Sequence, residues 1–198
     1  MSIKFIKGFV AKPGTTGAIV PSSGSLAKEM LRYFPVDQKP VIVELGPGTG
    51  AITKQIVEKK HVNQDIYAFE LNLDFEKHLR NKFPEVEFFF QSATTLPEIL
   101  KNKGDKKVGL VVSSLPWANF NQDLQDNLLD VIRESMSENA VFSTYAYVHA
   151  LKLKKAKNFA ERLNHYFEEV HTSEVVWKNL PPAIIYHCFK KARGLHKE

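Results

Sequence analysis

The sequence is poor in cysteine, which limits how the fold can be stabilised. Cys188 is its single cysteine, and its seven histidines show no spacing typical of metal ligands. One thiol cannot form an internal disulfide, and a zinc site needs several cysteine or histidine ligands. We therefore predict a protein of a reducing compartment, the cytoplasm, without a bound metal ion.

Long apolar runs and flexible linkers are missing as well. No stretch reaches the roughly 18 apolar residues that span a bilayer, and Lys4, Lys7 and Pro13 interrupt any signal-peptide core. Without a linker rich in proline, glycine or serine, the sequence predicts one domain over 24–198, preceded by an N-terminal segment at 1–23. The net charge of +5 favours an anionic partner, which leaves both nucleic acid and anionic lipid open.

From residue 40 onward, short apolar runs alternate with helical stretches. We expect strands at 41–45, 66–70, 86–90, 108–113 and 140–145, with helices at 51–60, 74–83, 123–135 and 151–164 between or after them. Strands at 168–177 and 184–189 would then form a C-terminal antiparallel hairpin. The pattern predicts a Rossmann-like α/β fold, with a mostly parallel seven-stranded sheet and helices on both faces.

A glycine-rich turn follows the first predicted strand. Its sequence is Gly46-Pro47-Gly48-Thr49-Gly50, with Glu44 just before it. Glycines in such a turn let the backbone approach a ligand without a Cβ collision, at the edge where parallel sheets bind nucleotide-like ligands. The spacing is one residue shorter than that of dinucleotide binders. It therefore favours a ligand without a pyrophosphate, such as S-adenosylmethionine, with Glu44 orienting its ammonium group.

Further cofactor contacts are expected where the next strands end. Glu70 lies twenty positions after Gly50, where an acidic residue would bind both ribose hydroxyls. Ser92-Ala93 follows the third strand, and the serine would accept a hydrogen bond from the adenine amino group. Leu71 and Ser113 complete the predicted cofactor site.

The segment Ser113–Phe120 follows the fourth strand and reads Ser-Ser-Leu-Pro-Trp-Ala-Asn-Phe. It stands where methyltransferases acting on amino nitrogens carry an Asn/Asp-Pro-Pro-aromatic motif. Such enzymes mainly align a neutral amine with the methyl carbon and exclude water. We therefore expect Ser114-Leu115-Pro116 beside the reacting nitrogen and Trp117 against the substrate.

Taken together, four motifs resemble the bacterial phospholipid N-methyltransferases, which methylate phosphatidylethanolamine towards phosphatidylcholine. They are Thr16–Ser23, Glu44–Gly50, Ser113–Pro116 and Asn179–Ala183. The resemblance implies a class I methyltransferase that uses S-adenosylmethionine and acts on a phospholipid at the inner membrane face, without nucleic acid. It implies cofactor contacts at Glu44, Gly46, Gly48, Gly50 and Glu70, catalytic roles for Ser114, Leu115, Pro116 and Tyr145, and acceptor binding by Trp117, Tyr145 and Asn179.

The sequence departs from the family in ways that leave other functions open. Gln91-Ser92-Ala93 replaces the usual Gly-Asp-Ala, and Ala146 replaces a glycine. An alternative is an rRNA adenine N6-dimethyltransferase, whose motif is Asn-Leu-Pro-Tyr, although position 114 is serine and no C-terminal helical domain follows. A second alternative is a non-catalytic, cofactor-binding protein that docks on membranes.

Two segments could contact a membrane. Wound as a helix, Ile3, Phe5, Ile6, Phe9 and Val10 share one side, and Lys4 and Lys7 share the other. Such a helix can lie in a bilayer interface, or it can pack on its own domain as a lid. The lysines of 152–157 form either a solvated helix face or a headgroup contact. Trp177 and Tyr186, in the terminal hairpin, are expected in the core.

Overall fold

The computed structural model describes residues 23–35 and 40–191. The predicted membrane segment, with Lys4, Phe5, Ile6, Lys7 and Phe9, lies outside these residues, as does most of the N-terminal motif. We therefore describe the domain from Ser23 onward.

Within the described residues, seven strands form one sheet in the order β3-β2-β1-β4-β5-β7-β6. Strands β1 to β5 are parallel, and β7 runs antiparallel between β5 and β6. Their bounds are β1 Val41–Leu45, β2 Ile66–Phe69, β3 Glu87–Phe89, β4 Val108–Ser113, β5 Met136–Tyr147, β6 Glu169–Thr172 and β7 Ala183–Phe189. The predicted sheet with its antiparallel end is confirmed.

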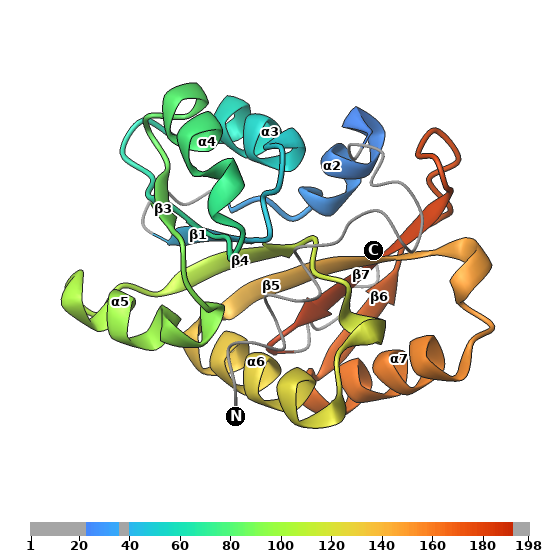
Figure 1. The fold of residues 1–198 in the computed structure, drawn as a ribbon. Helices are drawn as coiled ribbons and strands as arrows, with labels where there is room; N and C mark the ends of the chain where they lie inside the picture. Colours follow the sequence, from blue (N-terminus) through green and yellow to red (C-terminus); the bar gives the residue numbers. More distant parts are fainter. Residues whose placement is uncertain (1–22, 36–39, 192–198) are drawn as a thin grey trace, which may run out of the picture.

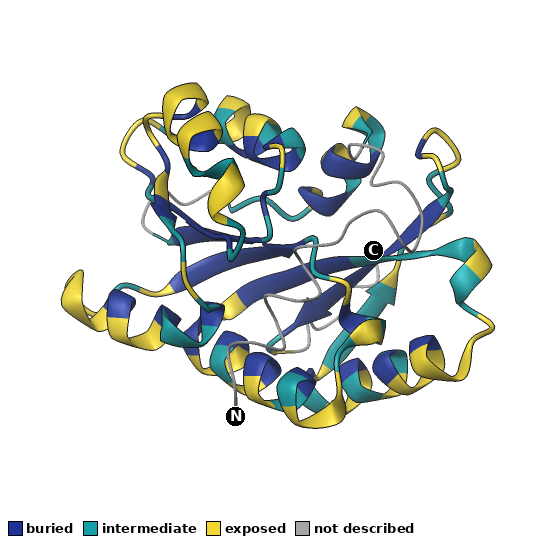
Figure 2. Cartoon of the chain, in the orientation of Figure 1, coloured by how far each residue is buried: buried dark blue, intermediate teal, exposed yellow. Residues whose placement is uncertain are grey.

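Helices cover both faces of the sheet, as Figure 1 shows. One face carries α2 Gly24–Met30, α3 Ala51–Lys59 and α4 Glu76–Lys82, and the other carries α5 Leu96–Asn102, α6 Gln122–Ser135 and α7 Lys154–Tyr166. Each layer packs its own apolar cluster against the sheet, so the central strands are buried from both sides (Figure 2). The sequence analysis did not predict α2 and α5.

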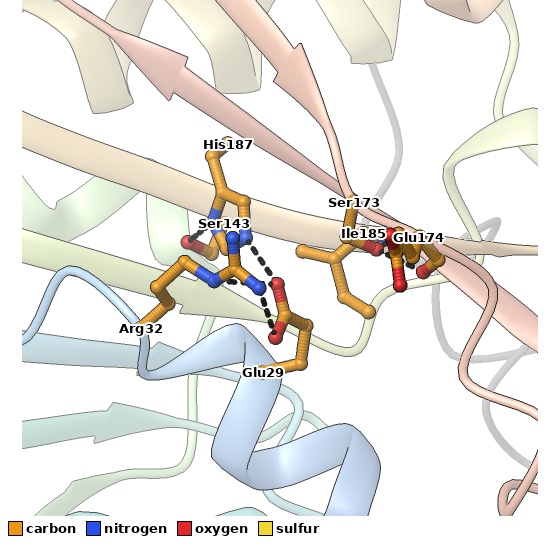
Figure 3. A network of polar contacts seen from close by, with 7 residues as sticks. All are labelled: Glu29, Arg32, Ser143, Ser173, Glu174, Ile185 and His187. Carbon is orange, nitrogen blue, oxygen red and sulfur yellow. Dashed lines mark hydrogen bonds and ion pairs between the residues drawn. The ribbon is translucent and has the colours of Figure 1, made fainter.

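Strand β6 ends at Thr172, five residues before its predicted end. The cause is Ser173, whose Oγ accepts the hydrogen bond of the Ile185 amide at 3.0 Å and donates to the carbonyl of Glu174 at 2.7 Å (Figure 3). A side-chain oxygen thus replaces a backbone carbonyl and ends the ladder. Residues 173–182 therefore form a long connection, with only an isolated bridge from Val176 to Ala183.

This connection changes the position expected for one aromatic residue. Tyr186, on β7, is buried as predicted, but Trp177 has 73% of its surface exposed, so its predicted place in the core is wrong. Trp177 lies in the 173–182 connection, beyond the end of the ladder, where nothing on the sheet can cover it.

A buried polar network fixes α2 against the last strand. His187 is fully covered on β7; its Nδ1 lies 2.9 Å from the Ser143 hydroxyl and its Nε2 lies 3.4 Å from Glu29 of α2, which also pairs with Arg32 (Figure 3). Burial, the largest influence, lowers the pKa of His187 to about 4. The ring is therefore neutral near pH 7, with Nε2–H donating to Glu29 and Nδ1 accepting from Ser143.

Candidate active site

The glycine turn connects β1 to α3 in a conformation that non-glycine residues rarely adopt. Gly46, Gly48 and Gly50 have φ angles of +75°, +55° and +81°. A Cβ on Gly46 would lie 3.1 Å from Leu115, and one on Gly48 would project into open space. At Gly50 a Cβ would meet the Phe83 ring at 2.4 Å. Gly46 and Gly48 thus keep a cradle open, whereas Gly50 allows α4 to pack, which the sequence alone did not indicate.

Glu70 follows β2 and is bonded to this turn. One carboxylate oxygen accepts the Gly48 amide at 3.1 Å, and the other accepts the amides of Leu71 at 2.8 Å and Asn72 at 2.9 Å. The side chain is 95% covered, yet it lines the cleft beside the turn. A carboxylate has about four acceptor positions, so these three amides leave one position that can accept a hydrogen bond from a hydroxyl of a diol.

This geometry gives a prediction for Glu70. Glu70→Ala should weaken cofactor binding by about 1.5–3 kcal/mol, because it removes charged acceptors for the diol and frees the Gly48 amide. Calorimetric titration of the folded variant measures the loss. Glu134→Ala, at an exposed position near the end of α6, is the matched control. Wild-type affinity in Glu70→Ala would remove Glu70 from the site.

Glu44 is buried completely beneath the turn, on the face of β1 that packs against α3. Neither of its carboxylate oxygens accepts a hydrogen bond of normal geometry from a described residue. Burial raises the pKa of Glu44 to about 8, with a further increase from Glu70 and a partial opposing effect from Thr53. An acceptor left without partners in the interior costs free energy. A cation bound at the turn would relieve that cost, so Glu44 fits the sulfonium and ammonium groups of S-adenosylmethionine.

A cleft opens at the carboxyl ends of β1, β2 and β4, and some of the predicted cofactor residues line it. Phe120 and two leucines of α6, Leu124 and Leu128, close its far side, and the sequence analysis missed all three. The two leucines lie one helical turn apart, a spacing that could have revealed them. The remaining lining residues are Leu45, Gly46, Phe69, Glu70, Leu71, Gln91, Ser92, Ala93 and Leu115.

Ser92 does not match its predicted role as an acceptor for adenine. Its hydroxyl oxygen already contacts the amide of Thr94 at 3.3 Å and the hydroxyl of Thr94 at 2.9 Å, because Ser92 caps a short 3₁₀ helix at 93–95. Both acceptor positions of a hydroxyl are thereby used. Ser92 and Ala93 still line the cleft, so they can contact an adenine ring through their backbone and carbon atoms.

The acceptor motif is anchored in the core by its aromatic residue. Trp117 is buried, stacks on Phe159 of α7 at 5.3 Å and meets Phe142 edge-on. Its indole N–H donates to the Ser113 hydroxyl at 2.9 Å. The Ser113 side chain thus holds Trp117 in the core, and the contact of Trp117 with the substrate stays a prediction.

The residues between Ser113 and Trp117 lie at the edge of the cleft. Leu115 lines the cleft, Ser114 is half-buried with its amide bonded to the Leu45 carbonyl at 2.9 Å, and Pro116 is exposed. Tyr145 lies on the neighbouring strand β5, one residue beyond the pair Ser113–Thr144. The structure thus brings Ser114, Leu115 and Tyr145 to the carboxyl ends of β4 and β5, next to the cofactor turn.

Asn179, which is predicted to contact the acceptor, is held in place by two hydrogen bonds. It is buried, its Oδ1 accepts the Ser23 amide at 3.0 Å and its amide nitrogen donates to the Pro181 carbonyl at 2.7 Å. The first and last motifs of the sequence therefore meet through this one side chain. Its place is structural, at the start of α2.

Comparisons with known proteins agree with this arrangement. The chain is 30% identical over 181 residues to the ornithine lipid N-methyltransferase of Singulisphaera acidiphila, covering 89% of this chain and 90% of that protein. It is 32% identical to the ribosomal RNA small subunit methyltransferase A of Prochlorococcus marinus over 83 residues, 41% of this chain and 29% of that protein. No family model matches the chain.

Solved structures share the fold. An rRNA methylase from Streptococcus thermophilus superimposes with a TM-score of 0.62 at 10% identity, covering 83% of this chain and 94% of that one. The O-methyltransferase of tomaymycin synthesis from Streptomyces achromogenes, solved with S-adenosylmethionine, gives 0.62 at 14% identity, covering 84% and 79%. The chain therefore belongs to the family of the ornithine lipid N-methyltransferase, within the class I S-adenosylmethionine-dependent methyltransferases.

Proposed function

We propose that this methyltransferase acts on the amino headgroup of a membrane lipid, methylating phosphatidylethanolamine and its methylated intermediates towards phosphatidylcholine at the membrane surface. The observation that carries the proposal is the position of Ser114 and Leu115. They join the cofactor cleft to the end of β5, in a chain that matches a lipid N-methyltransferase over nearly its full length.

The chain's own residues would position the amine and exclude water. S-adenosylmethionine, when bound, supplies an electrophilic methyl group on its sulfonium. The half-buried Ser114 hydroxyl makes no hydrogen bond with a described residue, so it is available to accept one from the amine. Leu115, Phe120 and Leu124 surround the cleft with apolar surface, which favours a neutral amine over a hydrated ammonium.

A second candidate acceptor is an ornithine lipid, which the name of the relative favours. Both acceptors present a primary amine at a membrane surface, so the same site chemistry serves either. The rRNA alternative is weaker, because the rRNA methyltransferase relative covers only 41% of this chain.

The acceptor can be tested directly with labelled S-adenosylmethionine. Purified protein is offered phosphatidylethanolamine vesicles, ornithine lipid vesicles or ribosomal RNA at one ionic strength. We expect label in at least one lipid and none in RNA, and Glu70→Ala serves as the cofactor-deficient control. Equal or better labelling of RNA would contradict the lipid assignment. Label in ornithine lipid alone would mean that ornithine lipid, and not phosphatidylethanolamine, is the substrate.

A further inference from the structure

Three large apolar side chains stand out of the molecule at one end of the sheet. Trp177, Leu180 and Leu153 have 73%, 71% and 60% of their surfaces exposed. Trp177 and Leu180 lie in the connection between β6 and β7, and Leu153 precedes α7. Both segments leave the sheet at the right-hand end in Figures 1 and 2, where their exposed tips are visible. Exposed large apolar side chains on two segments that share one end of the sheet indicate an interaction surface.

The two segments are bonded to each other at their base. Tyr147, the last residue of β5, pairs with Ala183, the first residue of β7. The next amide, that of Val148, donates to the Pro182 carbonyl at 2.9 Å. The tips at 151–153 and 177–180 thus rise from one hydrogen-bonded platform, and we call these two tips with the lysines around them the docking face.

The charge of the docking face is of one sign. Its exposed lysines are Lys152, Lys154, Lys155, Lys157 and Lys178. None forms an ion pair within the described part of the chain. The sequence has no acidic residue from 148 to 160 or from 175 to 182, and the exposed Glu174 precedes the second tip. Ala156, Phe159 and Leu163 turn the apolar side of α7 inward. The lysines of its first turn therefore face solvent, where they can contact an anionic surface.

The docking face adjoins the acceptor motif. Phe159, in the second turn of α7, stacks on Trp117, which anchors the Ser114–Pro116 segment. Tyr145 lies two residues before the β5 terminus that carries the platform. A flat partner lying on the docking face would therefore reach the edge of the sheet where the amine is expected.

We propose that the docking face binds an anionic lipid bilayer. Trp177, Leu180 and Leu153 enter the headgroup region, and the lysines contact lipid phosphates. A tryptophan with exposed lysines beside it suits this boundary, since its ring is amphipathic and basic side chains are attracted to anionic leaflets. The proposal rests on the proposed lipid function and identifies the surface through which the enzyme reaches that substrate.

Trp177 is a natural reporter, because the second tryptophan, Trp117, is buried and should respond little. Adding vesicles of phosphatidylglycerol and phosphatidylethanolamine to the full-length protein should shift its emission to shorter wavelength, and brominated lipids should quench it. In flotation assays, Trp177→Asp with Leu180→Asp should bind these vesicles at least about tenfold more weakly. Lys154→Ala with Lys155→Ala should lose about fivefold per lysine, and only on anionic vesicles.

Val62→Asp is the matched control. Val62 is 88% exposed but lies in the turn before β2, at the opposite edge of the sheet. The Val62→Asp variant should bind vesicles as the wild type does, and every variant should keep the cofactor affinity of the wild type. Activity of the double aspartate variant should fall on vesicles and persist on a short-chain lipid dissolved as monomers.

Two results would overturn the docking face. One is that the Trp177→Asp, Leu180→Asp double variant binds vesicles as strongly as the wild type, which would mean that other parts of the chain attach the protein to the membrane. The other is a wild type that is dimeric without lipid and becomes monomeric in this variant, which would assign the face to a second copy. Failure of the proposed function gives a different result: vesicle binding that depends on Trp177, with no lipid methylated by the wild type.

Discussion

Binding of S-adenosylmethionine at pH 6.5 is expected to release about one proton from the protein, with Glu44 as its source. In the ligand-free protein, burial raises the pKa of Glu44 to about 8, and its oxygens accept no hydrogen bond of normal geometry from a described residue. A bound cation beside the carboxylate stabilises the ionised form and lowers that pKa. The proton held at pH 6.5 must then leave.

Cofactor affinity should therefore depend on pH. It should rise about tenfold per pH unit as the pH approaches 8. Binding that releases one proton becomes more favourable as the proton concentration falls. Above pH 8 the gain should stop, since free Glu44 is then ionised and the cofactor's own amine loses its proton near pH 7.7–8.0, as α-amino groups do.

Calorimetry in buffers of different ionisation enthalpy measures the released proton. At pH 6.5 the apparent binding enthalpy should change with the buffer, because Glu44 releases its proton. Glu44→Gln should bind more weakly and show no buffer dependence at pH 6.5. A buffer-independent enthalpy in the wild type at pH 6.5 would mean that Glu44 keeps its proton and does not face the cation.

The same group affects the stability of the ligand-free protein. The pKa of Glu44 is above its ordinary value of 4.5 in the folded state, so folding favours the protonated form. This stabilising contribution is complete below pH 4.5 and is lost as the pH rises through about 8. Glu44 thus costs stability at neutral pH until a cation binds.

Substitutions in the glycine turn should separate folding from binding. Gly50→Ala should lower the free energy of unfolding by roughly 2–4 kcal/mol, since it combines an unfavourable positive φ with a Cβ that overlaps the Phe83 ring. Gly48→Ala should cost only about 1 kcal/mol, the penalty for its backbone conformation. It should nevertheless weaken cofactor binding by more than about tenfold, because its methyl group enters the open cradle.

Urea unfolding and calorimetric titration measure the two effects. Gly104→Ala is the matched control, since Gly104 has φ +90° and open space around it but lies away from the cleft. It should resemble Gly48→Ala in stability and the wild type in binding. Adding Phe83→Leu to Gly50→Ala should recover part of the lost stability. Equal binding losses in Gly48→Ala and Gly104→Ala would show that the cradle is not the cofactor site.

The features predicted best from sequence depend on neighbouring residues. The glycine turn and the strand β4, apolar on both faces, are local signals, and the positions of Glu44, Gly46 and Glu70 at the sheet edge follow from them. The predicted strand β6 extends too far. Its true end depends on Ser173, whose hydroxyl binds the amide of Ile185 on the neighbouring strand β7.

Two residues of the site show the same limit of local sequence. Trp117 follows the acceptor motif and was read as a substrate contact, but its partner Phe159 lies 42 positions away on α7. Asn179 was read in the same way, although its partner Ser23 is at the opposite end of the described chain. The polar atoms of both residues are satisfied by contacts that sequence spacing cannot indicate.

The place of β7 in the sheet has a consequence for biosynthesis. Among the strands of the described residues it comes last in the chain, yet it lies between β5 and β6 and is buried along its whole length. Until residue 189 has emerged, β5 presents an unpaired edge, and α2 lacks the His187 contact that fixes its Glu29. An exposed strand edge invites pairing with another chain. A nascent chain of this protein therefore stays vulnerable to misassembly until residue 189 has emerged, when β7 both closes the sheet and fixes α2.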